Sequence, residues 1–344
     1  MRYPMIVAPF FVALVAVAGC ATEHESTAMH ETLGNIEQLD PGLSRVVSPH
    51  AKIEKLADGF TWSEGPAWVP AQHALFFTDV PENTMYRWSE KDGLSVFMKP
   101  SGYAGPDLGV LREPGANGLF AEPGGTLLVA NSGDRLVERL DLGTKKKTTL
   151  AQNLGGLRFN SPNDVVRRSD GVVFFTDPPY GLKNGNESTV KELKFNGVYR
   201  VDLDGRVVVI DDSLTFPNGV GLSPDERTLY VSNSDPQRPI WMAYSLDAKG
   251  DVVSKRVFAD ASDLLKPDAP GLPDGLSVAA DGTLFASAPG GILIMTPEGK
   301  RLGRIRTGGP IANCDFGDDG RTLYMTSNHL IARTHMVLNG WGKK

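Results

Sequence analysis

Cysteine is nearly absent from this 344-residue chain, which contains only Cys20 and Cys314. Cys20 ends an N-terminal segment that has the pattern of an export signal, so the chain beyond it keeps a single thiol. A single thiol excludes an intramolecular disulfide even in an oxidising compartment. We therefore expect Cys314 to be a small, buried apolar side chain.

Basic stripes, histidine clusters and helical periodicity are also lacking. The formal net charge is −6 with acids and bases interspersed, which excludes the usual electrostatic signature of nucleic-acid binding and of a polybasic membrane patch. The six histidines suggest no metal cluster. No serine stands in a strand-to-helix nucleophile turn, and almost no stretch has the period of an amphipathic helix. The expected partners are small molecules, and the sequence leaves the oligomeric state open.

Only one long apolar run is present, from about residue 6 to residue 18, between Arg2 and Cys20. This pattern is typical of a signal peptide and is too short for a membrane span. Residues 17–20, Val-Ala-Gly-Cys, resemble a bacterial lipobox, which favours acylation of Cys20 over a plain secretory signal. The sequence thus predicts an exported protein of the periplasm or cell envelope, attached to a membrane only through a lipid on Cys20.

Three regions are predicted along the chain. Residues 1–20 form the signal peptide, and residues 21–48, polar and without a strand pattern, form a tether or tail. Length alone allows the remainder to be one large or two ordinary domains. Residues 49–344 are predicted to be a single domain because one repeat runs through them.

Six segments of the chain match one another. Each has a polar residue, a brief apolar strand, a Gly/Asp/Pro turn, and a second strand rich in β-branched and aromatic residues. The six are SEGPAWVPAQHALFFTD (63–79), GANGLFAEPGGTLLVAN (115–131), SPNDVVRRSDGVVFFTD (161–177), FPNGVGLSPDERTLYVSN (216–233), LPDGLSVAADGTLFASA (272–288) and IANCDFGDDGRTLYMTSN (311–328).

Each unit continues with one or two more strand-like runs, which is the signature of four-stranded antiparallel β-propeller blades. Six units predict an all-β, six-bladed β-propeller. The last unit has chain left for about three strands, while residues 51–57 form a strand without a blade of their own. We therefore predict that this N-terminal strand completes blade six and closes the ring. The rival β-sandwich does not predict six copies of one unit.

The start of each first strand carries a side-chain oxygen. Inner strands of a propeller line its central channel, so these positions are expected to converge at one mouth. They are Glu64, Asn117, Asn163, Asn218, Asp274 and Asn313. A single Asn-Gly or Asp-Gly pair would indicate an ordinary turn. Glu is no turn former, however, and the pattern recurs in six units.

Two carboxylates in one channel repel each other, and their burial adds a further cost. A bound cation would offset both. The donors are all oxygens, with neither Cys nor His among them, which favours a hard cation. Ca²⁺ is the first candidate, with Mg²⁺, Mn²⁺ and then Zn²⁺ as alternatives.

The chain resembles the family of SMP-30, gluconolactonase and luciferin-regenerating-enzyme proteins. The resemblance is carried by WSEGPAW, SPNDVV followed by FFTDPPYGL, FPNGVGLS and LPDGLSVAADG, and it extends from about residue 53 to residue 332. It implies a six-bladed propeller with one divalent metal, usually calcium, in the channel mouth. The ligands implied by matching position are Glu64, Asn163, Asn218 and Asp274. Where some family members have a substrate-binding Arg, this chain has Ser161.

A calcium ion with four protein ligands keeps open positions and could polarise a lactone carbonyl. The predicted reaction is hydrolysis of a sugar lactone such as a gluconolactone. Asp274 is the first candidate for the general base, with Glu64 behind it. A carboxylate bound to a metal is a weak base, which makes this the weakest step of the hypothesis.

Three long insertions, 99–116, 178–197 and 260–273, are expected on the same mouth. They suggest Tyr180 and Arg112 as residues that shape a substrate pocket. Four other residues complete the candidate set: Ser161, Asn117 and Asn313 as possible substrate contacts, and Tyr103 as a further pocket residue. For each, a role in stabilising its own loop or blade is the alternative.

Two other functions remain open. The same cation could serve an organophosphate or phosphotriester hydrolase, since a phosphoryl oxygen binds it as well. The propeller could instead be a calcium-stabilised binding protein without catalysis, because the fold does not determine the function.

Overall fold

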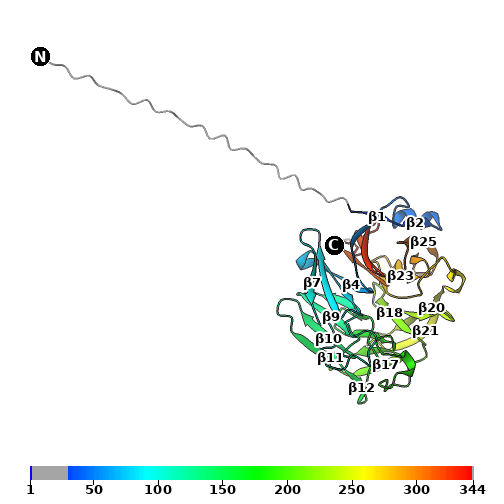
Figure 1. The fold of residues 1–344 in the computed structure, drawn as a ribbon. Helices are drawn as coiled ribbons and strands as arrows, with labels where there is room; N and C mark the ends of the chain where they lie inside the picture. The colour runs from blue at the N-terminus through cyan, green and yellow to red at the C-terminus, as the bar shows by residue number, and fades with distance from the viewer. Residues whose placement is uncertain (2–29, 343–344) are drawn as a thin grey trace. The chain divides into compact units, whose positions relative to one another are not determined.

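The computed structural model describes Met1 and residues 30–342, so Cys20 and all of the predicted signal peptide except Met1 lie outside the described residues. Within the compact unit that begins at Glu31, six antiparallel β-sheets follow one another along the chain (Figure 1). The inner strands of successive sheets contact one another in chain order, and the inner strand of the last sheet contacts that of the first. The prediction of a six-bladed propeller is therefore confirmed.

The first four blades each contain four consecutive strands, from the channel outward. Blade one comprises β4 (Ser63–Val69), β5 (Ala74–Asp79), β6 (Thr84–Ser89) and β7 (Gly93–Met98). Blade two comprises β8 (Leu119–Glu122), β9 (Thr126–Asn131), β10 (Leu136–Asp141) and β11 (Lys147–Ala151). Blade three comprises β14 (Val165–Arg167), β15 (Val173–Asp177), β16 (Gly197–Val201) and β17 (Val207–Asp211). Blade four comprises β18 (Pro217–Leu222), β19 (Thr228–Asp235), β20 (Arg238–Leu246) and β21 (Val252–Asp260).

The last two blades each recruit strands from the N-terminal side of the chain. Blade five comprises β22 (Leu276–Val278), β23 (Leu284–Ala288), β24 (Gly291–Met295), β25 (Arg301–Arg306) and, on its outer edge, β2 (Asn35–Gln38). Blade six comprises β26 (Asn313–Gly317), β27 (Thr322–Ser327), β28 (Leu330–His335), β3 (Ile53–Asp58) and β1 (Thr32–Leu33). Figure 1 shows these blue N-terminal strands beside the orange and red C-terminal strands.

The ring closes as predicted, because β3 pairs with β28 and supplies the fourth strand of blade six. Its register places Ile331 opposite Ala57 and Thr334 opposite Ile53. The closure joins the two ends of the repeat through backbone hydrogen bonds. It also covers an edge of β28 that would otherwise be open to pairing with another chain.

The predicted tail of residues 21–48 needs correction from Glu31 onward. Strands β1 and β2 extend blades six and five, and the 3₁₀-helix η1 (Pro41–Arg45) follows them. Leu43 and Val47 are fully buried in a hydrophobic cluster that includes side chains of blades five and six. These strands are short and lack a clear alternation of apolar residues, so their sequence gave no strand signal.

Helical structure is minor in the described part of the chain. Besides η1, it consists of the 3₁₀-helices η2 (Pro70–Gln72), η3 (Gly185–Glu187) and η4 (Ser262–Leu264). A short β-hairpin, formed by β12 (Asn153–Leu154) and β13 (Leu157–Arg158), follows blade two. None of the described helices has the length and hydropathy of a membrane span.

Large side chains fill the spaces between blades. Trp68 of blade one stacks on Tyr324 of blade six with ring centroids 5.2 Å apart. Trp241 of blade four is fully buried in a cluster with side chains of blade five. Both tryptophans therefore pack between blades, as expected from the sequence. Cys314 is buried as well, with its Sγ 3.5 Å from the carbonyl oxygen of Phe285.

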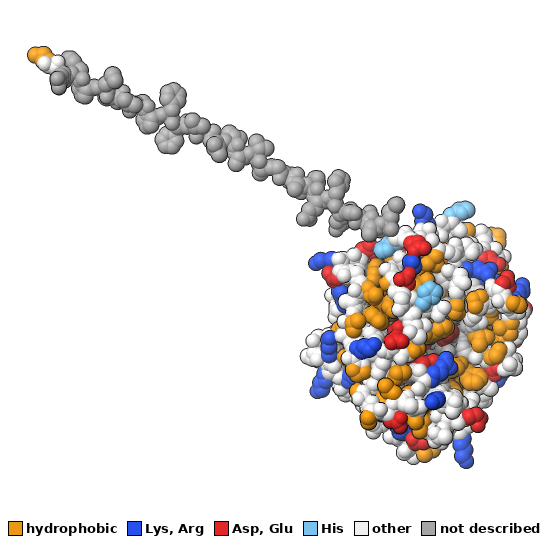
Figure 2. Space-filling view, in the orientation of Figure 1, with side chains coloured by type: hydrophobic (Ala, Val, Ile, Leu, Met, Phe, Trp, Pro, Cys, Tyr) orange, Lys and Arg blue, Asp and Glu red, His pale blue; other side chains and the backbone are white. Residues whose placement is uncertain are grey.

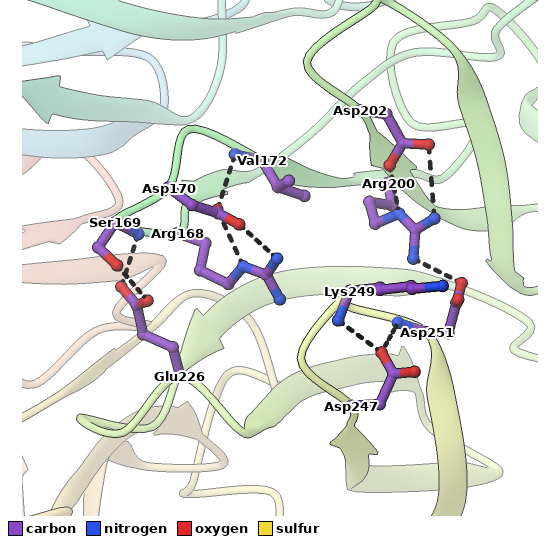
Figure 3. Close-up of polar contacts among 10 residues, drawn as sticks. All are labelled: Arg168, Ser169, Asp170, Val172, Arg200, Asp202, Glu226, Asp247, Lys249 and Asp251. Atoms are coloured by element: carbon purple, nitrogen blue, oxygen red, sulfur yellow. Dashed lines mark hydrogen bonds and ion pairs between the residues drawn. The ribbon is translucent and has the colours of Figure 1, made fainter.

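Polar contacts also connect blades three and four (Figure 3). The backbone N–H and hydroxyl of Ser169, in one turn, donate to the carboxylate of Glu226, in the matching turn of the next blade, at 2.7 and 2.6 Å. The buried Arg200 pairs with Asp202 and with Asp251, each at 2.7 Å. On the face drawn in Figure 2, acidic and basic side chains are intermixed, in line with the charge pattern of the sequence.

Candidate active site

A cavity of about 640 Å³ opens where the inner strands begin. The predicted convergence of side-chain oxygens is confirmed for five of the six blades. The five residues that line this cavity are Glu64, Asn117, Asn163, Asn218 and Asp274. Four of them are nearly inaccessible, with exposed fractions between 3% and 5%, and Asp274 is partly exposed.

Asn313 is the exception, and its predicted place in this cavity is wrong. It lines a second cavity of about 640 Å³, together with Asp164 and Asp315. Its side-chain Oδ1 accepts a hydrogen bond from the backbone N–H of Cys314 at 2.8 Å. Blade six therefore contributes no Asn side chain to the candidate site.

The reason is a one-residue difference in the register of blade six. In three other blades, the residue that lines the cavity, called here the channel residue, donates its backbone N–H to a carbonyl of the second strand. These bonds run from Asn117 to Ala130, from Asn163 to Thr176 and from Asp274 to Ser287. In blade six, the matching bond runs from Ala312 to Thr326 at 2.9 Å. Successive side chains of a strand alternate in direction, so the side chain one residue later points away from the site.

The glycine after several of these channel residues is required by the close approach of neighbouring inner strands. A Cβ on Gly65 would lie 2.2 Å from the carbonyl oxygen of Asn117. A Cβ on Gly219, which follows Asn218, would lie 2.3 Å from the carbonyl oxygen of Asp274. Both distances are far inside van der Waals contact, so the Asn-Gly pair serves packing between blades as well as turning.

Gly219→Ala is expected to destabilise the protein by about 3 kcal/mol, because the new methyl group would push apart the strands that carry Asn218 and Asp274. The free energy of unfolding in urea would measure this. Gly143→Ala is the matched control, since its Cβ would meet only Asp141 Oδ1, at an ordinary 3.5 Å. Equal stability of the two variants would contradict the proposed strand contact.

Hydroxyl groups of the second strands fix the backbone of the next blade's channel residue. Thr78 donates to the carbonyl of Asn117 at 3.0 Å, and Thr176 donates to the carbonyl of Asn218 at 2.5 Å. Ser234 follows a similar pattern, since its hydroxyl donates to the carbonyl of Pro273, next to Asp274, at 2.5 Å. The amide group of Asn218 donates in turn to Ser234 Oγ at 3.3 Å. The candidate site is therefore built on rigid, bonded backbone.

Three carboxylates face this cavity: Glu64, Asp274 and Glu113. Burial raises the pKa of Glu64 to about 8, against hydrogen bonds donated by Trp62 Nε1 and the Gly65 N–H, each at 3.2 Å. Burial also raises the pKa of Asp274 well above its ordinary value, and the charge of Glu64 raises it further. Among the described lining residues, the one basic side chain is Arg112, which is two-thirds exposed and pairs with Glu113 at 3.2 Å.

The other predicted contacts divide into those that reach the cavity and those that do not. Tyr180 and Arg112 line it, and the ring of Tyr180 stacks on Phe216 with centroids 5.7 Å apart. Ser161 is fully buried away from it, since its hydroxyl donates to the carbonyl of Pro178 at 2.6 Å and accepts from the Gly181 N–H. Ser161 therefore supports the loop that carries Tyr180. Tyr103 does not line the cavity.

All three long insertions reach the cavity, as predicted. The first supplies Arg112 and Glu113, the second Tyr180, and the third Gly271 and Leu272. Sequence reasoning missed Glu113 and Trp62, because neither belongs to the repeated strand pattern. The one available signal for Glu113 was its position in a long insertion just before the second repeat.

The donor chemistry of the cavity fits a hard cation. In residues 30–342, no group of three or more His, Cys, Asp or Glu side chains is arranged to hold a metal ion. A cation here would therefore need amide oxygens beside two carboxylates, which is a donor set that suits Ca²⁺ better than Zn²⁺. Burial raises the pKa values of these carboxylates, and a positive charge at this position would stabilise their ionised forms.

Comparison with known proteins gives consistent results. The family model described as SMP-30/Gluconolactonase/LRE-like region matches residues 62–329. The gluconolactonase of Zymomonas mobilis subsp. mobilis is 42% identical over 325 residues, which cover 93% of this chain and 91% of that protein.

Solved structures agree with this relationship. A gluconolactonase from Xanthomonas campestris has a TM-score of 0.76 at 28% identity, covering 90% of this chain and 98% of that chain. A calcium-binding regucalcin from Agrobacterium tumefaciens has a TM-score of 0.65 at 19% identity, covering 84% of this chain and 97% of that chain. At that identity the second likeness concerns the fold alone.

Proposed function

This chain belongs to the SMP-30/gluconolactonase/LRE-like family, and from that premise we propose that it is a hydrolase that opens a sugar lactone, such as a gluconolactone, to its aldonic acid. We further propose that a divalent cation, Ca²⁺ in the first place, takes part. The observation that carries the proposal is a cavity of small-molecule size whose floor gathers carboxylate and amide oxygens from five blades.

Four residues would hold the cation: Glu64, Asn163, Asn218 and Asp274. All four line the cavity, and they come from four different blades. When bound, the cation supplies Lewis acidity that polarises the lactone carbonyl. The chain itself preorganises part of this set, since hydrogen bonds from Thr176 and Ser234 fix the backbone at Asn218 and at Pro273, the residue before Asp274.

The rim would orient the sugar ring and limit the access of bulk water. Trp62 and Tyr180 present aromatic surface, and Leu272 and Ile311 present aliphatic surface. Aromatic and aliphatic walls around a few polar groups are typical of sites for small organic ligands. Arg112, which is exposed, would meet the carboxylate of the aldonic acid product.

The test is a proton-release assay with glucono-δ-lactone, corrected for spontaneous hydrolysis. We expect turnover that a chelator lowers to background and that Ca²⁺ restores, because the proposed reaction needs the cation to polarise the carbonyl. Elemental analysis of the same samples should show the loss and return of bound metal.

Three other outcomes would overturn the proposal in whole or in part. Turnover of a fluorophosphate but of no lactone would indicate a phosphotriester hydrolase. Turnover of neither, together with a higher melting temperature in Ca²⁺, would indicate a calcium-stabilised binding protein. Full lactonase activity in protein free of metal would remove the cation from the mechanism.

A further inference from the structure

Glu113 is the third carboxylate of the candidate site, and it differs from the other two in its origin. Glu64 and Asp274 lie where inner strands begin, whereas Glu113 lies in the insertion that joins blades one and two. Its side chain nevertheless lines the same cavity and is only 9% exposed. It is not among the four residues that would hold the cation.

The backbone that carries Glu113 is fixed by the second insertion. The N–H groups of Arg112 and Glu113 both donate to the carbonyl of Gly181, at 2.8 and 3.2 Å. A β-bridge between Leu111 and Leu182 extends this contact. Backbone contacts between two insertions far apart in the sequence thus position Glu113.

The carboxylate of Glu113 is less engaged than that of Glu64. Both oxygens of Glu64 accept hydrogen bonds, from Trp62 Nε1 and from the Gly65 N–H. Glu113 makes one ion pair with the described residues, in which its Oε1 lies 3.2 Å from Nη2 of the exposed Arg112. Lone pairs of Glu113 therefore remain available to a water molecule in the cavity.

Glu113 shares its cavity with Glu64, Asp274 and Tyr180. Its negative charge raises the pKa of Glu64, of Asp274 and of the Tyr180 phenol. Burial raises the pKa of Glu113 itself to about 7, against the opposing charge of Arg112. A carboxylate in this range can both accept and return a proton near neutral pH.

We propose that Glu113 is the general base of the lactone hydrolysis, and that Asp274 serves only to hold the cation. This inference rests on the proposed function. Asp274 was the base suggested by the sequence, but a carboxylate that binds a dication is a weak base. Glu113 lines the same cavity and is not one of the proposed ligands of the cation.

The proton path balances within the site. Glu113 takes a proton from a water molecule while the water oxygen forms a bond to the lactone carbonyl carbon. The bond between that carbon and the ring oxygen then breaks, and the ring oxygen takes the proton back from Glu113. The product is the open hydroxy acid, which ionises in solution, and Glu113 regains its starting state.

The experiment compares Glu113→Gln and Glu113→Ala with the wild type and with Asp107→Asn, an exposed acid of the same insertion that lies outside the cavity. We expect both Glu113 variants to lose roughly 10²- to 10⁴-fold in kcat for glucono-δ-lactone, with KM nearly unchanged. Bound calcium at saturating concentration should match that of the wild type, and the melting temperature of Glu113→Gln should not fall below it, because the amide avoids the cost of burying the carboxyl. Added formate should restore part of the activity of Glu113→Ala by replacing the missing carboxylate.

Three results would overturn the proposal. Near wild-type kcat in Glu113→Gln would show that another group takes the proton. Loss of bound calcium would make Glu113 a metal ligand, and a rise in KM alone would make it a substrate contact. If the wild type itself opens no lactone, the proposed function fails first, and this inference fails with it.

Discussion

Glu64→Gln is expected to lower kcat/KM for glucono-δ-lactone by at least about 10²-fold and to abolish the rise in melting temperature produced by Ca²⁺. The substitution removes one of two ligand charges from the proposed cation site. Loss of a residue that only hydrogen-bonds to a metal ligand already lowers the affinity for the metal roughly 10- to 100-fold. Loss of a charged ligand should cost more.

The same variant should have the opposite effect on the protein without metal. In chelator, Glu64→Gln is expected to melt a few degrees higher than the wild type, by on the order of 2 kcal/mol in stability. Burial raises the pKa of Glu64 to about 8, so at neutral pH the metal-free folded protein must keep this carboxyl protonated, at a cost in free energy relative to the unfolded chain that a neutral amide does not carry. Differential scanning calorimetry with and without Ca²⁺ would measure both effects.

Asp107→Asn is again the control, because it removes one charge from an exposed position. It should change neither the stability in chelator nor the response to Ca²⁺. A lower melting temperature for Glu64→Gln than for the wild type in chelator would contradict a cost in stability for burying this carboxyl.

The second large effect concerns the segment that the sequence marked as a tail. A chain beginning at Ala51 is expected to be less stable than a chain beginning at His30 by on the order of 5 kcal/mol. The shorter chain lacks Leu43 and Val47, both fully buried, as well as the nearly buried Ile36 and Val46. Each such side chain contributes about 1.5–3 kcal/mol, reduced by the entropy of ordering the segment.

Urea unfolding of the two chains would measure this difference, and the single substitution Leu43→Ala should account for about 2–5 kcal/mol. The longer chain is the reference because it keeps every strand that the structure describes. Equal midpoints for the two chains would restore the interpretation of residues 31–48 as a dispensable tail.

The repeat explains why the fold could be predicted from the sequence. Six copies of a polar residue, a short strand, a turn and a second strand leave few alternatives to a propeller. The strand predicted at residues 51–57 had no blade of its own, which indicated how the ring closes. Glu64, Asn163, Asn218 and Asp274 could be located because the repeat places each at the start of an inner strand. Their convergence in one cavity follows from the architecture.

The errors arose where local pattern and tertiary packing diverge. In blade six the chain reads Ala312-Asn313, and similarity of residue type aligned Asn313 with the other asparagines, whereas backbone bonding makes Ala312 equivalent. Strand β2 has the sequence Asn-Ile-Glu-Gln, and only its pairing with β25 makes it a strand. Glu113 gave no periodic signal because its position depends on the contact of two loops.

The pairing of β3 with β28 has a consequence for folding during synthesis on the ribosome. Ala57 cannot meet Ile331 until nearly the whole chain has been synthesised. At roughly 5–20 residues per second, the first strand waits tens of seconds for its partner. During that delay its edge is open to wrong neighbours, so a chaperone or rapid closure at the end of translation would decide the yield of correctly closed rings.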